Sequence, residues 1–479
     1  MSGAARVLCL ASSLALMACN APQDTRAARN ALAGERTLAE GLVVRVGGGA
    51  IVARETVEGG FKVTVRAQSL DVRVEVEDKG CQPRLVEITV SHLPPAADGV
   101  ETRWRPFLGA LSPTVAATRR ALGGAVLLSG DADDPDWTPL AGAATFAPLL
   151  EPEVRVWTVE TDRGQRAAIV HPRRIEDVER TARAGACATL GAQALGELGQ
   201  APVIARHRLR VPFEDRDVTF AVWGNTAGRS GTRGRILGAV ALSGVDFAVV
   251  TGDLTAQGTR DQLEAAAAQI DAALEVPWFA TLGNRDVQGE AGDDYLPIIG
   301  TSRFAFDAGP VRLAVVDSGD AALSGADHAS LARWLGRKPL WWQATAAPPV
   351  SVVLTHVPPF DPFGARGAGF KSRLEATRVM ALLQRARVPY LLTSNLAIWR
   401  TDDLAGVQVV HAGGGGAPLE DGTGDFFWLR VTARAGCVPV GTAGVALGAP
   451  CGDGCAGGSA CVEGACAPCV VVERRDPLP

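Results

Sequence analysis

The chain has 479 residues, more than one hydrophobic core usually holds, and we expect about two to four domains. Its formal net charge is −5, with 47 Lys and Arg against 52 Asp and Glu. That balance excludes the strongly basic surface through which proteins bind nucleic acid, so no nucleic-acid partner is expected. Hydrophobic residues make up 47% of the chain, the usual share in a globular protein.

The first residues have the pattern of an export signal. Met1–Arg6 is short and positive, Val7–Ala18 is apolar, and the segment ends in Leu16-Met17-Ala18-Cys19. An apolar stretch of this length is typical of a secretory signal and too short to span a bilayer. The ending resembles a bacterial lipobox, which implies that residues 1–18 are a lipoprotein signal peptide and that Cys19 receives the lipid. The alternative is a plain signal peptide in which this Cys occurs by chance.

The predicted lipid would be the membrane anchor of the chain. No later segment has the roughly 18 consecutive apolar residues of a membrane span. Residues 19–38 are polar and small, and we expect them to form a tether. Asn20 is not the acidic residue that often retains lipoproteins in the inner membrane, which favours the outer membrane. The sequence thus predicts an exported protein of the cell envelope.

Residues 39–205 are predicted to form a β-rich domain. Apolar and polar residues alternate with a period of two in four segments, at 43–46, 61–65, 72–76 and 86–90. Gly and Pro clusters separate these segments, and such a pattern favours a β-sandwich or a barrel-like module. An Ala-rich segment at 175–198 is expected to be helical.

Residues 206–435 alternate strand patterns with helix patterns, which indicates stacked βαβ units. Strands are expected at 218–223, 246–251, 278–282, 311–316, 350–355, 390–393, 407–410 and 426–431. Helices are expected at 236–242, 260–274, 329–336 and 374–387. Polar residues recur just beyond the ends of the strands, where open α/β folds bind their ligands.

Eight cysteines remain after the predicted signal and the lipid site are set aside: Cys81, Cys187, Cys437, Cys451, Cys455, Cys461, Cys466 and Cys469. An exported chain meets an oxidising compartment, so all eight are disulfide candidates. The first two are the only thiols of the β-rich region. The other six lie in the Gly-rich tail, and we expect residues 436–479 to form a small disulfide-stapled module. Zinc is the alternative, because Cys466 and Cys469 have CxxC spacing, but the tail has no His and no second CxxC.

Five strand ends carry short motifs. They are Gly224-Asn225-Thr226-Ala227-Gly228, Gly252-Asp253, Gly283-Asn284-Arg285-Asp286, Thr355-His356-Val357-Pro358-Pro359 and Ser394-Asn395-Leu396-Ala397. In order, spacing and flanks they resemble the five blocks of the calcineurin-like phosphoesterases, the superfamily of the purple acid phosphatases. The resemblance covers about residues 218–432. It implies an α/β fold, a sandwich of two mixed sheets flanked by helices, between the β-rich domain and the Cys-rich module.

The resemblance also implies ligand positions for two metals, which active members of the family hold about 3.5 to 4 Å apart. The first metal would lie among Asn225, Ala227, Asp253 and Ala397, and the second among Asp253, Asn284, His356 and Asn395. Asp253 is the only intact ligand of the first set, since Ala has no donor and Asn offers a neutral carbonyl in place of a carboxylate. In the second set Asn395 is the weak member.

Electrostatics argues against two ions in this site. Two divalent ions 3.5 Å apart repel each other by about 19 kcal/mol at an effective dielectric constant of 20, and anionic ligands must offset that repulsion. The chain keeps one ligand carboxylate, so we expect either no metal or one divalent ion at Asp253, Asn284 and His356. The mostly oxygen donors favour a harder ion than zinc. His411 ends a neighbouring strand, where a structural role is expected and a donor role is the alternative.

Arg285 stands where the family has a His that assists the leaving group. The favoured interpretation is that it pairs with Asp253 or Asp286 and neutralises a vestigial site. The alternative is a metal-free pocket, in which Arg285 and backbone amides of the Gly-rich turns hold phosphate or a sulfated or carboxylated ligand. An anionic or phosphorylated ligand is therefore the expected partner.

The function expected from the sequence is that of an exported lipoprotein with a catalytically impaired phosphoesterase domain. As a pseudo-phosphoesterase it would act in binding or scaffolding. The alternative is a residual phosphoester hydrolase, a phosphatase or phosphodiesterase with a single divalent metal. The family is one of hydrolases, so the sequence alone leaves both an enzyme and a pseudoenzyme open.

Overall fold

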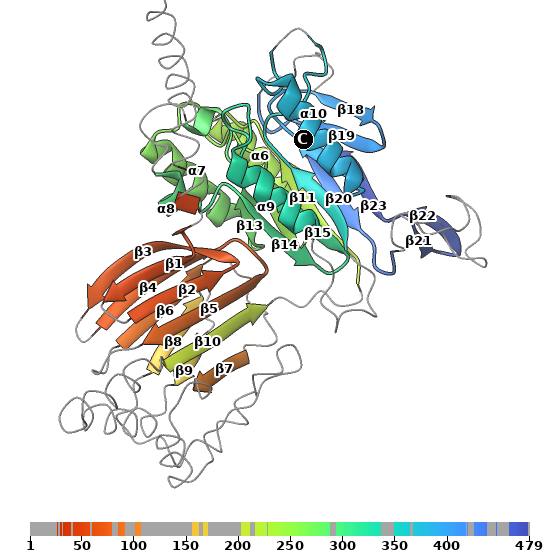
Figure 1. The fold of residues 1–479 in the computed structure, drawn as a ribbon. Coiled ribbons are helices and arrows are strands. Elements are labelled where there is room, and N and C mark those ends of the chain that lie inside the picture. The colour runs from red at the N-terminus through yellow and green to blue at the C-terminus, as the bar shows by residue number, and fades with distance from the viewer. Residues whose placement is uncertain are drawn as a thin grey trace, which may run out of the picture. The chain divides into compact units, whose positions relative to one another are not determined.

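Figure 1 shows a computed structural model of the chain. The structure describes residues 26, 29–30, 32–39, 42–57, 60–78, 85–91, 101–106, 156–161, 166–170, 203–210, 216–227, 229–287, 294–336, 349–364, 367–417, 419, 426–437, 447 and 459–477. The predicted signal peptide, Cys19, the helix predicted at 175–198 and four of the disulfide candidates (Cys81, Cys187, Cys451 and Cys455) lie outside these residues. Within them, no helix is both long and apolar enough to cross a membrane.

The chain divides into two compact units, residues 33–212 and residues 1–32 together with 213–479. The first unit holds two five-stranded sheets. One sheet has the order β1 (Glu35–Ala39), β2 (Leu42–Gly47), β5 (Asp71–Asp78), β10 (Val203–Arg210) and β7 (Glu101–Pro106). The other has the order β3 (Gly49–Val57), β4 (Gly60–Ala67), β6 (Leu85–Ser91), β8 (Val156–Thr161) and β9 (Arg166–Val170).

The strand-rich character predicted for this unit is confirmed. In β5 the valines at 72, 74 and 76 are buried, because side chains of a strand alternate between its two faces. They share one hydrophobic cluster with Val63, Val65, Val86 and Ile88 of the other sheet. Strand β1 begins at Glu35, inside the segment expected to be a tether, and β10 continues to Arg210, beyond the boundary expected at 205.

The second unit contains a sheet of five strands and a sheet of six. The first has the order β13 (Trp278–Ala280), β12 (Phe247–Val250), β11 (Val218–Trp223), β20 (Trp428–Ala433) and β23 (Val470–Arg475). The second has the order β14 (Phe304–Ala308), β15 (Val311–Val315), β16 (Val350–Leu354), β17 (Tyr390–Thr393), β19 (Val407–Ala412) and β18 (Trp399–Leu404). Both sheets mix parallel and antiparallel pairs.

The two sheets of this unit pack face to face through an aromatic cluster. The ring of Phe247 lies 5.6 Å from that of Phe306, and the ring of Phe279 lies 4.8 Å from the same ring. The central strands are buried on both faces, which explains why β11 and β12 are continuous apolar runs in the sequence. The predicted sandwich of two mixed sheets is therefore confirmed.

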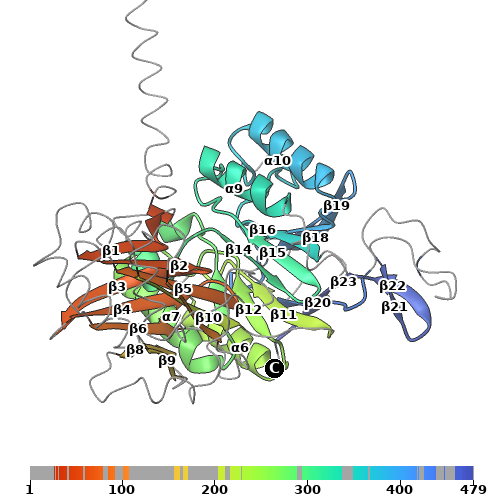
Figure 2. The same ribbon diagram turned by 60° about the horizontal axis from the view of Figure 1, so that its bottom comes forward.

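Helices cover the outer faces of both sheets (Figure 2). α6 (Ser230–Ala241) and α7 (Arg260–Ala273) share a hydrophobic cluster with the first sheet, and the short α8 (Tyr295–Ile298) joins them. α9 (Gly325–Leu335) and α10 (Arg373–Arg385) share a cluster with the second sheet. The apolar face that the sequence predicts for α7 is buried, and the hydroxyl of Thr259 caps its first turn.

The described part of the tail contributes a strand to the first sheet of the second unit. Its last strand, β23, is an edge strand of the first sheet and pairs antiparallel with β20. The run Val470-Val471-Val472 supplies the strand pattern, and the hydroxyl of Tyr390 donates to the carbonyl of Val470 over 3.3 Å. A hairpin of β21 (Ser459–Val462) and β22 (Ala465–Pro468) precedes it.

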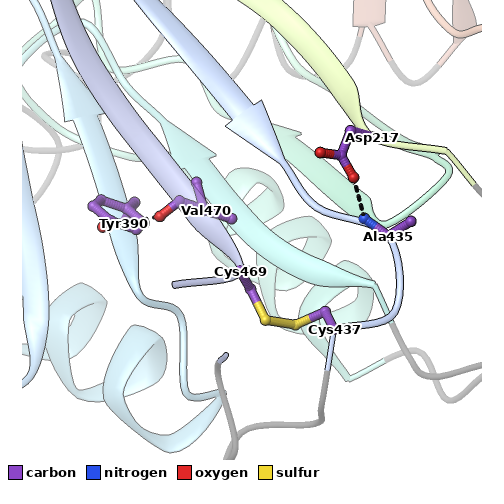
Figure 3. Close-up of a disulfide and its surroundings, with 6 residues drawn as sticks. All are labelled: Asp217, Tyr390, Ala435, Cys437, Cys469 and Val470. Atoms are coloured by element: carbon purple, nitrogen blue, oxygen red, sulfur yellow. Dashed lines mark hydrogen bonds between the residues drawn. A yellow bond between two sulfur atoms is a disulfide. The ribbon is translucent and has the colours of Figure 1, made fainter. Parts of the chain in front are cut away.

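One disulfide closes the tail where β20 and β23 meet (Figure 3). Cys437 is bonded to Cys469, next to the paired residues Ala433 and Val470. Cys461 and Cys466 are disulfide-bonded as well. Disulfides, not zinc, thus account for all four cysteines that the structure describes in the tail.

We expect removal of this disulfide by Cys437→Ser and Cys469→Ser to lower the free energy of unfolding of the second unit by about 3 to 4 kcal/mol. The two cysteines are 32 positions apart, and loop closure of that length accounts for the estimate in the chain-entropy model. Urea unfolding measures the change. An unchanged midpoint would show that β23 stays on β20 without the bond.

Candidate functional site

The candidate site lies where parallel strands of both sheets end. Asn225 follows β11, Asp253 follows β12, Asn284 follows β13, His356 follows β16 and Asn395 follows β17. Backbone hydrogen bonds join these loops: Asn225 N donates to Gly252 O over 3.0 Å, and Asn395 N donates to His356 O over 2.9 Å. The fold therefore brings the five sequence motifs to one edge.

His356 is fully buried and turns one ring nitrogen toward two other candidate donors. Its Nδ1 lies 2.8 Å from the carbonyl oxygen of Thr251, which can only accept, so Nδ1 carries a proton. Its Nε2 lies 2.9 Å from Asn284 Oδ1 and 3.4 Å from Asp253 Oδ1. Metal-binding histidines are commonly held this way, with the outer ring nitrogen on a backbone carbonyl.

Asp253 divides its two oxygens between different neighbours. Oδ1 accepts from the backbone N–H of Arg285 over 2.9 Å and faces His356. Oδ2 lies 3.4 Å from Nε of Arg285. The Asp253 side chain is 3% exposed and that of Arg285 is 44% exposed, so the guanidinium covers the carboxylate from the solvent side. This is the ion pair between Arg285 and Asp253 that the sequence favoured over a free anion-binding Arg285.

Asp286 connects the loop after β12 with the loop after β13. Its Oδ1 accepts from the backbone N–H and the hydroxyl of Thr255, and its Oδ2 accepts from the backbone N–H of Gly283. Burial and the nearby carboxylate of Asp253 raise the pKa of Asp286 to about 6. This role was missed from the sequence, where Asp286 appears as the acid that ends the third motif and as a candidate partner of Arg285.

The remaining predicted ligand positions supply little. Ala227 and Ala397 have methyl side chains, and the amide of Asn395 donates to the carbonyl of Ala368 over 3.0 Å. The backbone nevertheless keeps an unusual shape, with φ of 59° at Asn225, 47° at Ala227 and 54° at Asp253. Left-handed backbone is costly for residues other than Gly and is typical of functional sites. The left-handed backbone thus occurs at Asp253 and also at Asn225 and Ala227, where the carboxylate and imidazole that the resemblance implies are missing.

His411 lies in a separate network. Its Nδ1 lies 3.1 Å from the hydroxyl oxygen of Thr393, and its Nε2 lies 3.3 Å from Asp402 Oδ2. Burial lowers the pKa of His411 despite the pull of the Asp402 carboxylate. Both of these contacts join strands of one sheet, which is the structural role expected for this His. Asp402 could not be assigned from the sequence because β18 was not predicted.

The donor set fits at most one cation. Donors at right angles about 2.1 Å from an octahedral ion lie about 3.0 Å apart. The distances from His356 Nε2 to Asn284 and Asp253, 2.9 and 3.4 Å, are close to that spacing. In the part of the chain that the structure describes, no group of three or more His, Cys, Asp and Glu side chains could hold a metal ion. Ala227 and Ala397 offer no side-chain donor to a second ion.

Comparison with known proteins is consistent with this architecture. The family model of the calcineurin-like phosphoesterases matches residues 220–394. A search of curated proteins finds no match. Among solved structures, purple acid phosphatase PPD1 from yellow lupin (Lupinus luteus) seeds is similar at 14% identity, with a TM-score of 0.39 over 76% of this chain and 68% of that chain.

Two further solved structures are similar at low identity. GAP50, named as the anchor in the inner membrane complex of Plasmodium, is 15% identical, with a TM-score of 0.35 over 46% of this chain and 82% of its own. Vacuolar Protein Sorting 29 from Cryptosporidium parvum is 9% identical, with a TM-score of 0.25 over 55% of this chain and 99% of its own.

Proposed function

Because residues 220–394 form a domain of the calcineurin-like phosphoesterase family, we propose that the chain is a catalytically impaired member of that family that acts in binding or scaffolding. The observation that carries the proposal is the ion pair that Asp253 forms with Arg285. Asp253 is the one carboxylate among the predicted ligands, and its Oδ2 is already paired with the guanidinium of Arg285. A second ion at this oxygen would have to displace a fixed positive charge.

The ligand that we propose for this domain is an anionic or phosphorylated group. Nε of Arg285 pairs with Asp253, but the Arg285 side chain is 44% exposed. A guanidinium offers several N–H donors in a planar fork that matches phosphate and carboxylate oxygens. The half-exposed guanidinium therefore supports an anion-binding role at the end of β13.

A second candidate function is phosphoester hydrolysis with one divalent ion. The spacing of His356 Nε2, Asn284 Oδ1 and Asp253 Oδ1 favours it, because these three atoms would hold such an ion. When bound, an ion of this kind lowers the pKa of a coordinated water. The chain's own part would be to orient these donors, through the bond from Nδ1 of His356 to the Thr251 carbonyl and the bond from the Arg285 N–H to Asp253.

We also propose that the chain is an exported lipoprotein of the cell envelope, held at the outer membrane in its mature form by a lipid on Cys19. The support is the order of charged, apolar and small residues before Cys19. Mass spectrometry of the membrane fraction, with a Cys19→Ser variant as control, would detect the acyl chains on the mature N-terminus.

One experiment separates the two candidate functions of the domain. The purified chain is incubated with Mn²⁺, passed through a desalting column and assayed for bound metal and for hydrolysis of p-nitrophenyl phosphate and bis(p-nitrophenyl) phosphate. We expect less than one ion per chain and no hydrolysis above that of His356→Ala, because too few anionic donors converge. Turnover that is lost in His356→Ala supports the one-ion hydrolase, and two retained ions per chain contradict both candidates.

A further inference from the structure

The N-terminal segment around Arg26 docks on the domain that carries the candidate site. Nε of Arg26 lies 3.1 Å from Asp317 Oδ2, and Nη2 lies 2.5 Å from Asp320 Oδ2. The side chain of Arg26 is 10% exposed and that of Asp317 is 3% exposed. A buried guanidinium is stable only where carboxylates pair with it, so Asp317 and Asp320 form a guanidinium-binding site.

A second side chain fastens the same segment. The amide of Asn30 donates to the hydroxyl of Ser302 over 2.8 Å, and that hydroxyl donates to Asp317 Oδ2 over 2.8 Å. Arg26 contacts Asp317 directly, and Asn30 reaches the same carboxylate through the hydroxyl of Ser302. Two side chains of the segment are thus linked to one buried carboxylate.

The loop that binds Arg26 also contacts the candidate site. Within this loop, the hydroxyl of Ser318 accepts from the backbone N–H groups of His356, over 3.0 Å, and of Val357, over 2.9 Å. Gly319 packs against the turn before Asn284 so closely that a Cβ there would lie 3.2 Å from the carbonyl oxygen of Gly283. The loop therefore lies between Arg26 and two of the three candidate donors.

We propose that the segment around Arg26 is an intramolecular strap, which occupies the guanidinium-binding site of Asp317 and Asp320 and holds His356 and Asn284 in position. Arg26 is a positioning residue, since it acts on the site only through the loop after β15. This inference goes beyond the proposed function, because the strap positions the loops whether the site takes an anion or a cation. The segment expected to be a free tether would then have a docked part.

The test compares the full-length chain with its Arg26→Ala variant after selective ¹⁵N labelling of histidine. The ring signals of His356 should shift in the variant, because its backbone follows the loop. Those of His411, which is buried in its own network with Thr393, should stay unchanged. Hydrogen exchange at the backbone amides of His356 and Val357 should become faster by at least about 10-fold, because the loop opens locally.

Two further variants control this test. Arg26→Lys keeps the positive charge but loses the planar guanidinium that can pair with two carboxylates. Its His356 shift and its exchange rates should lie between those of the wild type and those of Arg26→Ala. Arg260→Ala removes an exposed arginine paired with Glu264, and should change none of the signals. If Arg26→Ala does not fold, Asp320→Asn replaces it, because this carboxylate is 34% exposed and forms half of the guanidinium site. Unchanged His356 signals and exchange in the folded variant would overturn the proposal.

Discussion

A chain that carries Asn225→Asp, Ala227→His, Asn395→His and Ala397→His is expected to retain two divalent ions where the wild type retains at most one. The change adds a carboxylate and three imidazoles at the four ligand positions that lack them, two of which, Asn225 and Ala227, have left-handed backbone. Ala227 has a φ of 47°, a region that His occupies more readily than most residues. Removing residues that only support the ligands already lowers metal affinity by about 10- to 100-fold. Four added ligands should have a larger effect, so we expect the affinity for Mn²⁺ to rise by about 100-fold or more.

Isothermal titration with Mn²⁺ and metal analysis measure this gain. The matched control is the same four-residue variant with Asp253→Asn, which has nearly the same shape but lacks the shared carboxylate, and it should lose most of the gain. Ala397 is buried, so the added ring is expected to cost about 1 to 3 kcal/mol of stability. If the variant is folded and its affinity equals that of the wild type, the assignment of the ligand positions is wrong.

Replacement of Asp286 by Ala is expected to lower the free energy of unfolding by about 3 to 5 kcal/mol, because buried donors would lose their acceptor. The backbone N–H and hydroxyl of Thr255 and the N–H of Gly283 all donate to this carboxylate, which is fully buried. Without this carboxylate, the loops that carry Asp253 and Asn284 would lose the hydrogen bonds that join them. Urea unfolding at pH 7 measures the loss.

Asp286→Asn is the control for this prediction, because it keeps one acceptor oxygen and removes the titration. The pKa of Asp286 is raised in the folded chain, from 3.8 to about 6. A raised pKa means that the folded chain binds the proton more tightly. The resulting stabilisation is fully present below about pH 4 and is lost as the pH rises through about 6. The stability of the wild type relative to Asp286→Asn should therefore fall by about 2 kcal/mol between pH 4 and pH 6.

A stability difference that stays constant between pH 4 and 7 would contradict the raised pKa of Asp286. A loss of less than about 1 kcal/mol in Asp286→Ala would contradict its role as the link between the two loops, since surface substitutions have effects of that size.

The sequence by itself determined the second unit well, because its central strands are buried on both faces and appear as continuous apolar runs between polar strand ends. Strand β11 begins and ends at the residues predicted, and α7 begins at Arg260 as predicted. The motifs predicted five of the loops at the site edge, because the C-terminal ends of parallel strands meet there. The edge strands β14, β18 and β23 were missed, since a polar strand such as β18 has no pattern of burial.

Only the tertiary structure decided which partners the site residues have. Arg285 had two candidate carboxylates in the sequence, Asp253 and Asp286, and the fold places it on Asp253. Asn395 is turned to the Ala368 carbonyl. Arg26 and Asp317 are 291 positions apart, and no local pattern marks Arg26 as buried. Local periodicity determines strands and helices because each depends on neighbours in the chain, whereas ion pairs and hydrogen bonds between loops depend on where the whole fold brings those loops together.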